Sequence, residues 1–261
     1  MKPASPFSLE GKAAVVAGAS RGIGQAIAEA LARAGAHTIL AARSLQKLDA
    51  IAGKLRAEGL QAEAMELDIS SHESRLRFAE ELPVTDILIN VAGANIRRNF
   101  SDYTPEEYNF LMQTNLTGIV ELTQAVGKRM VARGQGGKIV MIGSLSCLMG
   151  MPYISIYTIT KSALAGLTRA LAAEWGPHNI QVNCIAPGFI ITDLNRKMWE
   201  PPEMLVWLKT AQASPRLGTP DDIAPLAVFL SSPGSDYITG QLIAADGGCS
   251  TTQIWPFAPV S

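Results

Sequence analysis

The sequence predicts a single α/β domain in which seven parallel strands form a doubly wound sheet with helices on both faces. Strand-like apolar runs alternate with amphipathic helical segments along the 261 residues, which is the pattern of βαβ units. The strand segments are almost continuously apolar, as expected when helices cover both sides of a sheet. A glycine-rich turn, "AGASRGIG", joins the first strand to the first helix.

Each strand expected in the first half of the chain is a short apolar run that ends at glycine or polar residues. The run "AAVVAG" leads directly into the glycine turn, and Gly35 ends the Ala-rich helix that follows. Right-handed crossovers then return each strand to the same sheet. The expected elements are strands 13–18, 37–42, 62–68 and 85–93 and helices 22–34, 45–58 and 73–82.

The second half of the chain continues the alternation. A long helix with Thr104 as its cap is expected over 105–133. A helix that reaches residue 175 begins near Tyr157, and residues 189–219 are less regular. No linker or repeat is visible, so residues 1–261 are predicted to form one domain with an apolar, Pro-containing tail at 249–261. The other expected elements are strands 137–144, 179–188 and 240–248 and helix 221–230.

The composition excludes several classes of protein. The chain is 48% hydrophobic with a net charge of -1, so it has a sizeable core and no basic field for nucleic acid or an anionic membrane. The N-terminus "MKPASPFSLEGK" lacks the apolar core of a secretory signal, and no apolar run is long enough to span a membrane. Cys147, Cys184 and Cys249 match neither a disulfide framework nor a zinc spacing. We expect no metal and a cytoplasmic location.

The glycine turn predicts a dinucleotide site. Gly18, Gly22 and Gly24 have the spacing G-x3-G-x-G directly after a buried strand and at the start of a helix. Glycine lets the backbone turn tightly and approach a phosphate, and the N–H groups of a helix N-terminus bind the anion. The fold is therefore expected to be of the Rossmann type, with the dinucleotide at the carboxyl ends of the strands.

The end of the second strand predicts NADP(H), with NAD(H) as the alternative. An acidic residue at this place would bind a free ribose 2′-hydroxyl, but the chain has Ala41, Ala42 and Arg43 instead. No carboxylate repels a 2′-phosphate here, and the guanidinium groups of Arg43 and of Arg21 in the glycine turn suit one.

The stretch "SIYTITKSALAG" places Tyr157 and Lys161 four residues apart, on one face of a helix. Such a spacing is common by itself. Taken with the other motifs, in order and at the right intervals, it resembles the short-chain dehydrogenase/reductase family from about residue 9 to residue 248. "AGASRGIG" is similar to the family's coenzyme turn, with Ala17 where Thr is more usual, and Ser144 precedes Tyr157 by the family's usual 13 residues.

Other motifs support the same resemblance. "NVAG" is similar to the family's N-N-A-G, with Val91 in place of the second Asn, and "LDIS" supplies residues that border the adenine in the family. "APGFIIT" resembles the loop that meets the nicotinamide. The resemblance implies coenzyme contacts from Gly18, Ser20, Arg21, Gly22, Ile23, Gly24, Arg43, Asp68, Ile69, Asn90, Ala92, Gly93, Tyr157, Lys161, Pro187, Gly188, Ile190 and Thr192.

The resemblance also implies hydride transfer between nicotinamide C4 and a carbonyl or carbinol carbon. Tyr157 would be the acid/base, and the positive charges of Lys161 and of the oxidised nicotinamide would lower its pKa from about 10 by about 1–3 units. Lys161 would also hold the nicotinamide ribose, Ser144 would orient the substrate oxygen, and Asn115 would position a water for a proton relay.

The substrate is expected to be polar, and a sugar acid is favoured. "GANIRRNF" and "FSLEGK" are similar to the sugar-acid subgroup, which includes gluconate 5-dehydrogenases and ketodeoxygluconate dehydrogenases. The segment 189–219 would form a lid over the substrate, as in relatives. An arginine after the fourth strand would face a carboxylate or hydroxyl groups. The expected substrate contacts are Arg97, Arg98, Ser144, Tyr153 and Trp199.

Two alternatives remain open from the sequence. A β-ketoacyl carrier-protein reductase would need a basic dock, for which Lys128, Arg129 and Arg133 are candidates. A non-catalytic coenzyme-binding scaffold is less consistent with an intact set of catalytic residues. The family also implies a homotetramer, with the tail around Trp255 and Phe257 packed on a neighbour.

Overall fold

The apolar runs form one sheet in which all strands are parallel, in the order β3-β2-β1-β4-β5-β6-β7, as the sequence predicts. The computed structural model describes residues 5–253. The chain moves outward from β1 to β3 and then returns to β4 beside β1, so the strand order reverses between β1 and β4. The strands are β1 (Ala13–Ala17), β2 (His37–Ala42), β3 (Ala62–Glu66), β4 (Ile87–Asn90), β5 (Gly137–Ile142), β6 (Ile180–Pro187) and β7 (Leu242–Ala245).

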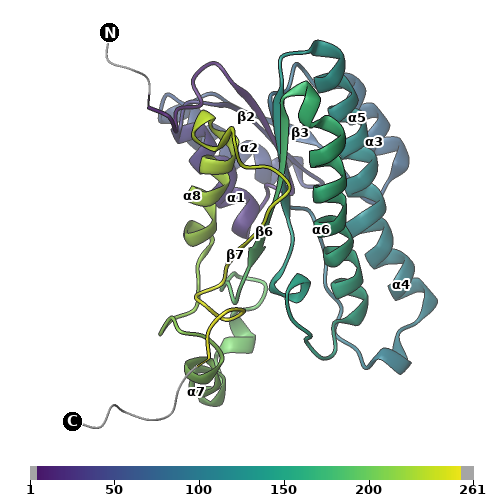
Figure 1. Cartoon of the computed structure of the whole chain (residues 1–261), viewed down its shortest axis with the longest axis vertical. Helices are drawn as coiled ribbons and strands as arrows, with labels where there is room; N and C mark the ends of the chain where they lie inside the picture. The colour runs from purple at the N-terminus through teal and green to yellow at the C-terminus, as the bar shows by residue number, and fades with distance from the viewer. Residues whose placement is uncertain (1–4, 254–261) are drawn as a thin grey trace.

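Helices cover both faces of this sheet (Figure 1). Neighbouring residues of a strand point to opposite faces, and accordingly Val15 and Val16 of β1 belong to two separate apolar cores. One face carries α1 (Gly22–Arg33), α2 (Leu45–Ala57) and α8 (Pro220–Ser231), and the other carries α3 (His72–Glu81), α4 (Pro105–Met112), α5 (Gly118–Arg133) and α6 (Ser155–Trp175).

Most strands end a little short of the predicted bounds, and β4 and β7 are less than half as long as predicted, because the backbone leaves the sheet for identifiable reasons. After β4, the amides of Val91 and Ala92 both donate to the Ala17 carbonyl, at 2.9 and 2.8 Å, and this turns the chain over the end of β1. After β7, Gly247 and Gly248 adopt φ values of +64° and +85°, which end the extended conformation.

The single helix predicted over 105–133 is wrong in one respect, because a π-helical turn at Gln113–Thr117 separates α4 from α5. The extra residue of a π turn shifts the side chains around it. Here it accompanies a buried Asn115 and a close approach of Gly118 to Ile69. The predicted cap is confirmed, since Thr104 and Glu107 form a reciprocal capping box.

The less regular segment 189–219 contains a 3-10 turn at Arg196–Trp199 and the helix α7 (Pro202–Ala211). In Figure 1 α7 lies below the carboxyl ends of β6 and β7. Trp255, Phe257 and the rest of the tail beyond residue 253 lie outside the described residues. No helix within residues 5–253 combines the length and hydropathy needed to cross a bilayer.

Candidate active site

The glycine turn after β1 leaves a helix N-terminus open. Gly18 has φ +103°, and a β-carbon there would lie 2.7 Å from the Ala92 amide nitrogen. A β-carbon on Gly24 would collide with the Gly18 carbonyl. Arg21 precedes α1 in an extended conformation, and no side chain caps the helix. The first N–H groups of α1 therefore remain available to an anion.

Arg43 lies at the end of β2, exposed and without an ion-pair partner among residues 5–253. The positive charge of Arg43 helps to lower the pKa of the nearby Asp68. Partial burial works to raise the pKa of Asp68, but hydrogen bonds from the Ser70 hydroxyl and amide, at 2.6 and 2.9 Å, outweigh it together with Arg43. The pKa of this carboxyl is consequently below its usual value, and the end of β2 presents a free guanidinium beside a fixed carboxylate.

The predicted acid/base pair lies in the first turns of α6. Lys161 is 3% exposed, and its Nζ donates to the Ile142 carbonyl at 2.8 Å and lies 5.8 Å from the centre of the Tyr157 ring. Burial lowers the pKa of Lys161 to about 8. Burial also raises the pKa of Tyr157, and a hydrogen bond with Ser144 offsets this only in part. In the structure, desolvation of the phenol therefore dominates its pKa.

Asn115 is completely buried and forms two hydrogen bonds with the backbone of Ala94, beyond β4. Its amide nitrogen donates to the Ala94 carbonyl at 2.8 Å, and its oxygen accepts from the Ala94 amide at 2.7 Å. A β-carbon on Gly93 would lie 3.4 Å from both the Asn115 oxygen and the Lys161 Nζ. The structure thus brings Asn115, Gly93 and Lys161 together.

Ser144 precedes a 3-10 turn at Leu145–Cys147, after the end of β5. Its oxygen accepts a hydrogen bond from the Ser146 amide at 3.1 Å. Because the oxygen accepts that bond, the hydroxyl proton is available for donation to the neighbouring Tyr157 oxygen or to a bound ligand. Ser144 can therefore act as a donor to a substrate oxygen.

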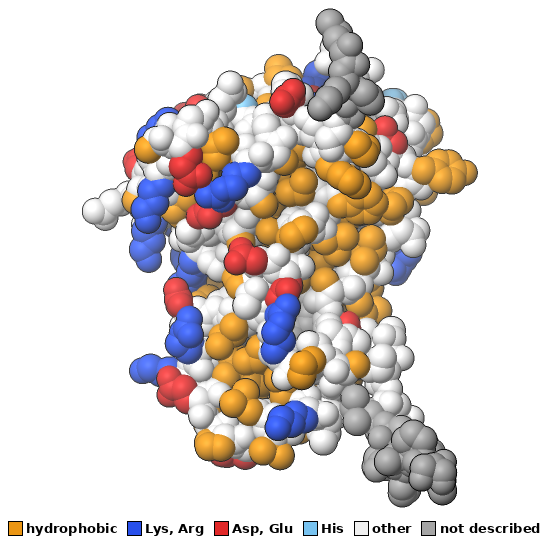
Figure 2. Space-filling view, turned by 90° about the vertical axis from the view of Figure 1, so that its left-hand side faces the viewer, with side chains coloured by type: hydrophobic (Ala, Val, Ile, Leu, Met, Phe, Trp, Pro, Cys, Tyr) orange, Lys and Arg blue, Asp and Glu red, His pale blue; other side chains and the backbone are white. Residues whose placement is uncertain are grey.

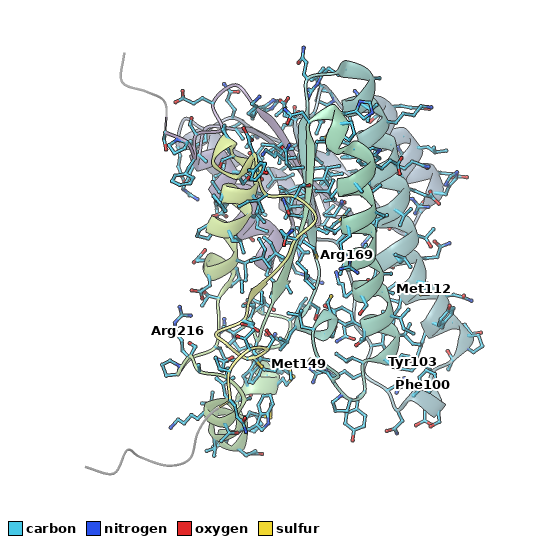
Figure 3. All side chains as sticks on the ribbon, in the orientation of Figure 1. Phe100, Tyr103, Met112, Met149, Arg169 and Arg216 are labelled. Carbon is cyan, nitrogen blue, oxygen red and sulfur yellow. The ribbon has the colours of Figure 1, made fainter. Side chains whose placement is uncertain are left out.

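The two predicted arginines differ. Arg98 forms a double hydrogen bond with Glu107, at 2.8 and 2.9 Å, while Arg97 is exposed and has no ion-pair partner among residues 5–253. Both arginines line a hollow of about 430 Å³ with Tyr153, whose φ is +66°. Figure 3 shows Phe100 and Tyr103 at the lower end of α6 and Met149 nearer α7, so the loops after β4 and β5 end on the same side of the molecule.

The expected lid, residues 189–219, begins against the glycine turn, since a β-carbon on Gly22 would lie 3.4 Å from the Thr192 methyl. Phe189 packs edge-to-face with Trp199 and Trp207, with ring centroids 5.6 and 5.2 Å apart. Trp199 was expected to contact substrate, but its ring is 4% exposed and belongs to this aromatic cluster. Its Nε1 is buried without a partner within the described residues.

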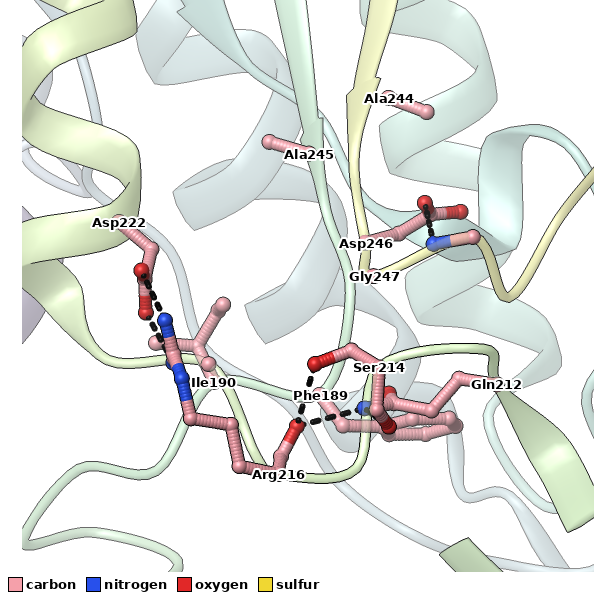
Figure 4. A pocket seen from close by; sticks show the side chains of 12 residues that line it. Phe189, Ile190, Gln212, Ser214, Arg216, Asp222, Ala244, Ala245, Asp246 and Gly247 are labelled. Atoms are coloured by element: carbon pink, nitrogen blue, oxygen red, sulfur yellow. Dashed lines mark hydrogen bonds and ion pairs between the residues drawn. The ribbon is translucent and has the colours of Figure 1, made fainter. Parts of the chain in front are cut away.

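A second cavity of about 320 Å³ lies between the lid and the end of β7 (Figure 4). Arg216 on its wall forms a two-fold ion pair with Asp222, each contact being 2.7 Å. Of the predicted site residues only Ile190 lines it. We therefore place the chemistry at Tyr157 and not in this cavity.

Sequence reasoning missed the groups that hold Lys161 and Asn115, two of the candidate catalytic side chains. Two are the carbonyls of Ile142 and Ala94, which any residue type can supply and which no sequence pattern therefore reveals. The third is Thr160, whose hydroxyl lies 3.3 Å from the Asn115 amide and which directly precedes Lys161.

An open helix N-terminus after the first strand, with a phenol, a hydroxyl and a buried ammonium further along the same sheet edge, defines a dinucleotide-dependent oxidoreductase. A family profile described as enoyl-(acyl carrier protein) reductase matches residues 18–250. The chain is 36% identical to gluconate 5-dehydrogenase of Gluconobacter oxydans, covering 94% of this chain and 97% of the relative. It is 39% identical to 2-dehydro-3-deoxy-D-gluconate 5-dehydrogenase of Bacillus subtilis, covering 93% and 96%.

A solved structure of a related protein has the same fold. A gluconate 5-dehydrogenase from Burkholderia cenocepacia, in complex with NADP and tartrate, superposes with a TM-score of 0.89 at 34% identity, covering 95% of this chain and 98% of that one. The chain belongs to the short-chain dehydrogenase/reductase family.

Proposed function

We propose that the protein is an NADP-dependent oxidoreductase of sugar acids. The observation that carries the proposal is the convergence of Lys161 and Asn115 on Gly93, beside a phenol and an open helix N-terminus. The bound coenzyme supplies or accepts a hydride at nicotinamide C4. The relatives that act on gluconate and ketodeoxygluconate, at 36% and 39% identity, support the substrate class.

The residues around the glycine turn fit a dinucleotide phosphate. Gly18 and Gly24 allow the tight turn, because β-carbons there would collide with the backbone, and the uncapped start of α1 offers N–H groups to the pyrophosphate. Arg43, which has no ion-pair partner among the described residues, would hold the 2′-phosphate, with Arg21 in support. The NADP in the Burkholderia cenocepacia structure supports this preference.

The protonation states favour Tyr157 as the proton donor in carbonyl reduction. Its raised pKa keeps the phenol protonated near neutrality, while Ser144 would hold the same carbonyl oxygen with its free hydroxyl proton. Lys161, with a pKa of about 8, exchanges protons readily near neutral pH and would return one to the phenol. Asn115 fixes the backbone around Lys161 and would position a relay water.

Arg97 is the better candidate for the carboxylate anchor, because the guanidinium of Arg98 is occupied by Glu107. Tyr153 would form a wall of the same hollow. The burial of Trp199 makes it a lid residue that contacts substrate only through a rearranged lid.

Steady-state turnover tests the proposal. With NADP(H), we expect the highest kcat/KM for gluconate or its 5-keto derivative, compared with simple ketones and acyl thioesters. Equal or faster turnover of an acyl thioester would contradict it. Turnover of any of these compounds excludes a non-catalytic scaffold.

The second candidate, a carrier-protein reductase, is suggested by the description of the matching family profile. Two of the basic residues proposed to bind the carrier protein, Arg129 and Arg133, are poorly placed for that role. Arg129 donates to the carbonyls of Ala79 and Leu82, and Arg133 pairs with Asp86 at 2.9 Å. These arginines also lie in the last turns of α5, roughly 20–27 Å along the helix axis from Asn115 in the preceding π turn. The sugar-acid function is therefore the better supported of the two.

A homotetramer in the cytoplasm completes the proposal. Figure 2 shows apolar side chains gathered over the upper part of the face that contains α8 and β7, where Val228, Phe229 and Ile243 are only partly buried. Such a patch suits a partner subunit. The three cysteines are free thiols, which is consistent with a reducing compartment. Sedimentation equilibrium is expected to give a tetramer, and a monomer would contradict this part of the proposal.

A further inference from the structure

An ion pair between a buried arginine and a partly exposed glutamate lies beneath the end of β3, outside the site described above. Arg75 of α3 is 4% exposed, and its Nε and one terminal nitrogen donate to Glu121 of α5 at 3.0 and 2.7 Å. His72 also lies 2.8 Å from the same carboxylate oxygen of Glu121. A buried arginine needs such a partner, because an unpaired charge in the interior is strongly unfavourable.

The remaining terminal nitrogen of Arg75 donates to the Ile69 carbonyl at 2.7 Å. Gly118, at the start of α5, packs against the same carbonyl, and its β-carbon, if present, would collide with it. The backbone at Ile69 is thus held from two sides, by a guanidinium from α3 and by the glycine of α5. Ordinary apolar packing of α3 on α5 would require neither contact.

The segment that Arg75 holds faces the adenosine end of the proposed coenzyme site. Dinucleotides bind across the carboxyl ends of the strands, with the adenosine ribose at the end of the second strand. Asp68 and Ile69 follow β3, which pairs with β2, and the charge of Arg43 at the end of β2 reaches Asp68. A shift of the Ile69 backbone would therefore move the wall of the adenosine site and leave the region around Tyr157 in place.

We propose that Arg75 is a positioning residue for the adenosine half of the coenzyme, with Glu121 as its counter-ion. The proposal rests on the NADP-dependent function proposed above. Arg75 itself need not touch the coenzyme, because it acts through the Ile69 carbonyl. Nicotinamide chemistry at Tyr157 should not depend on it.

Two fragments of the coenzyme separate this role from simple stabilisation. Adenosine 2′,5′-bisphosphate represents the adenosine half and can be titrated by calorimetry without turnover. Reduced nicotinamide mononucleotide represents the other half and can be followed by turnover. For Arg75→Met we expect affinity for the bisphosphate to fall about tenfold, the order of a lost charge-assisted hydrogen bond, with the KM for the mononucleotide unchanged.

The double variant Arg75→Met with Glu121→Leu separates loss of the Ile69 contact from loss of folding stability. Replacing both members avoids the unpaired buried charge that removal of Glu121 alone would leave, but it does not restore the bond to Ile69. We expect it to be as stable as the wild type and still to bind the bisphosphate about tenfold more weakly.

Arg133→Met is the matched control. Arg133 and Asp86 form another ion pair, with side chains 16% and 20% exposed, at the amino end of β4. This variant should lose stability and keep full affinity for the bisphosphate. A stable double variant with wild-type affinity would overturn the proposal. Failure of the wild type to bind either the bisphosphate or NADPH would instead overturn the proposed function, and this inference with it.

Discussion

Replacing Lys161 by methionine should stabilise the fold at neutral pH while abolishing turnover. The ammonium is 3% exposed, and burial lowers its pKa from 10.5 to about 8. That difference corresponds to about 3 kcal/mol by which the charged form destabilises the folded chain. Loss of the bond to the Ile142 carbonyl costs about 1 kcal/mol in return, so the net gain at pH 7 is about 2 kcal/mol.

The pH dependence of this stability difference identifies burial of the Lys161 ammonium as its cause. Between pH 8 and 10.5 the unfolded chain keeps a proton that the folded wild type has released, so the stability of the wild type rises with pH in this window. The advantage of Lys161→Met is therefore complete below pH 8. It should shrink by about 2.5 kcal/mol between pH 7 and pH 10.

Urea unfolding of both proteins at these two pH values, at equal protein concentration, measures the effect. Lys138→Met is the control, because Lys138 is also buried but is paired with Asp236 at 2.7 Å. This control should show neither the gain at neutral pH nor its decline. If Lys161→Met is less stable than the wild type at pH 7 and the difference does not vary with pH, the assigned burial cost is wrong.

Three further predictions concern activity. Tyr157→Phe should reduce kcat by roughly 10²–10⁴-fold with NADPH affinity nearly unchanged, and a variant that keeps half of the wild-type kcat would remove the phenol from the mechanism. Arg43→Ala should weaken NADPH binding by roughly 10–150-fold and hardly change NADH binding, as titration of both coenzymes would reveal. Arg97→Ala should raise the KM for a sugar acid about tenfold more than for a neutral ketone. Arg98→Ala, which removes an arginine already paired with Glu107, should affect both substrates alike.

The sequence predicts those parts of the site that local spacing determines. Tyr157 and Lys161 share a helix face because they are four residues apart, and the glycine turn follows from its place after an apolar run. Asn115 could be named, but the π turn around it could not, because a helical apolar pattern does not register one inserted residue. The difference between Arg97 and Arg98 depends on Glu107, nine residues away, and so needs the folded loop.

The direction of the Tyr157 pKa shift was also beyond the sequence. Spacing predicts that a cation lies nearby, but the degree of burial decides whether the charge or the desolvation dominates. The link from Arg75 to Ile69 joins α3 to the end of β3 through a carbonyl, which carries no sequence signature.

Isotope transfer tests the central claim most directly. The protein would be incubated with the 5-keto derivative of gluconate and NADPH that carries deuterium at both nicotinamide C4 positions, and the product would be examined by mass spectrometry. We predict gluconate or its C5 epimer with a single deuterium on the carbinol carbon. A reduced product without deuterium, or no reduced sugar acid while another carbonyl compound is turned over, would contradict the account.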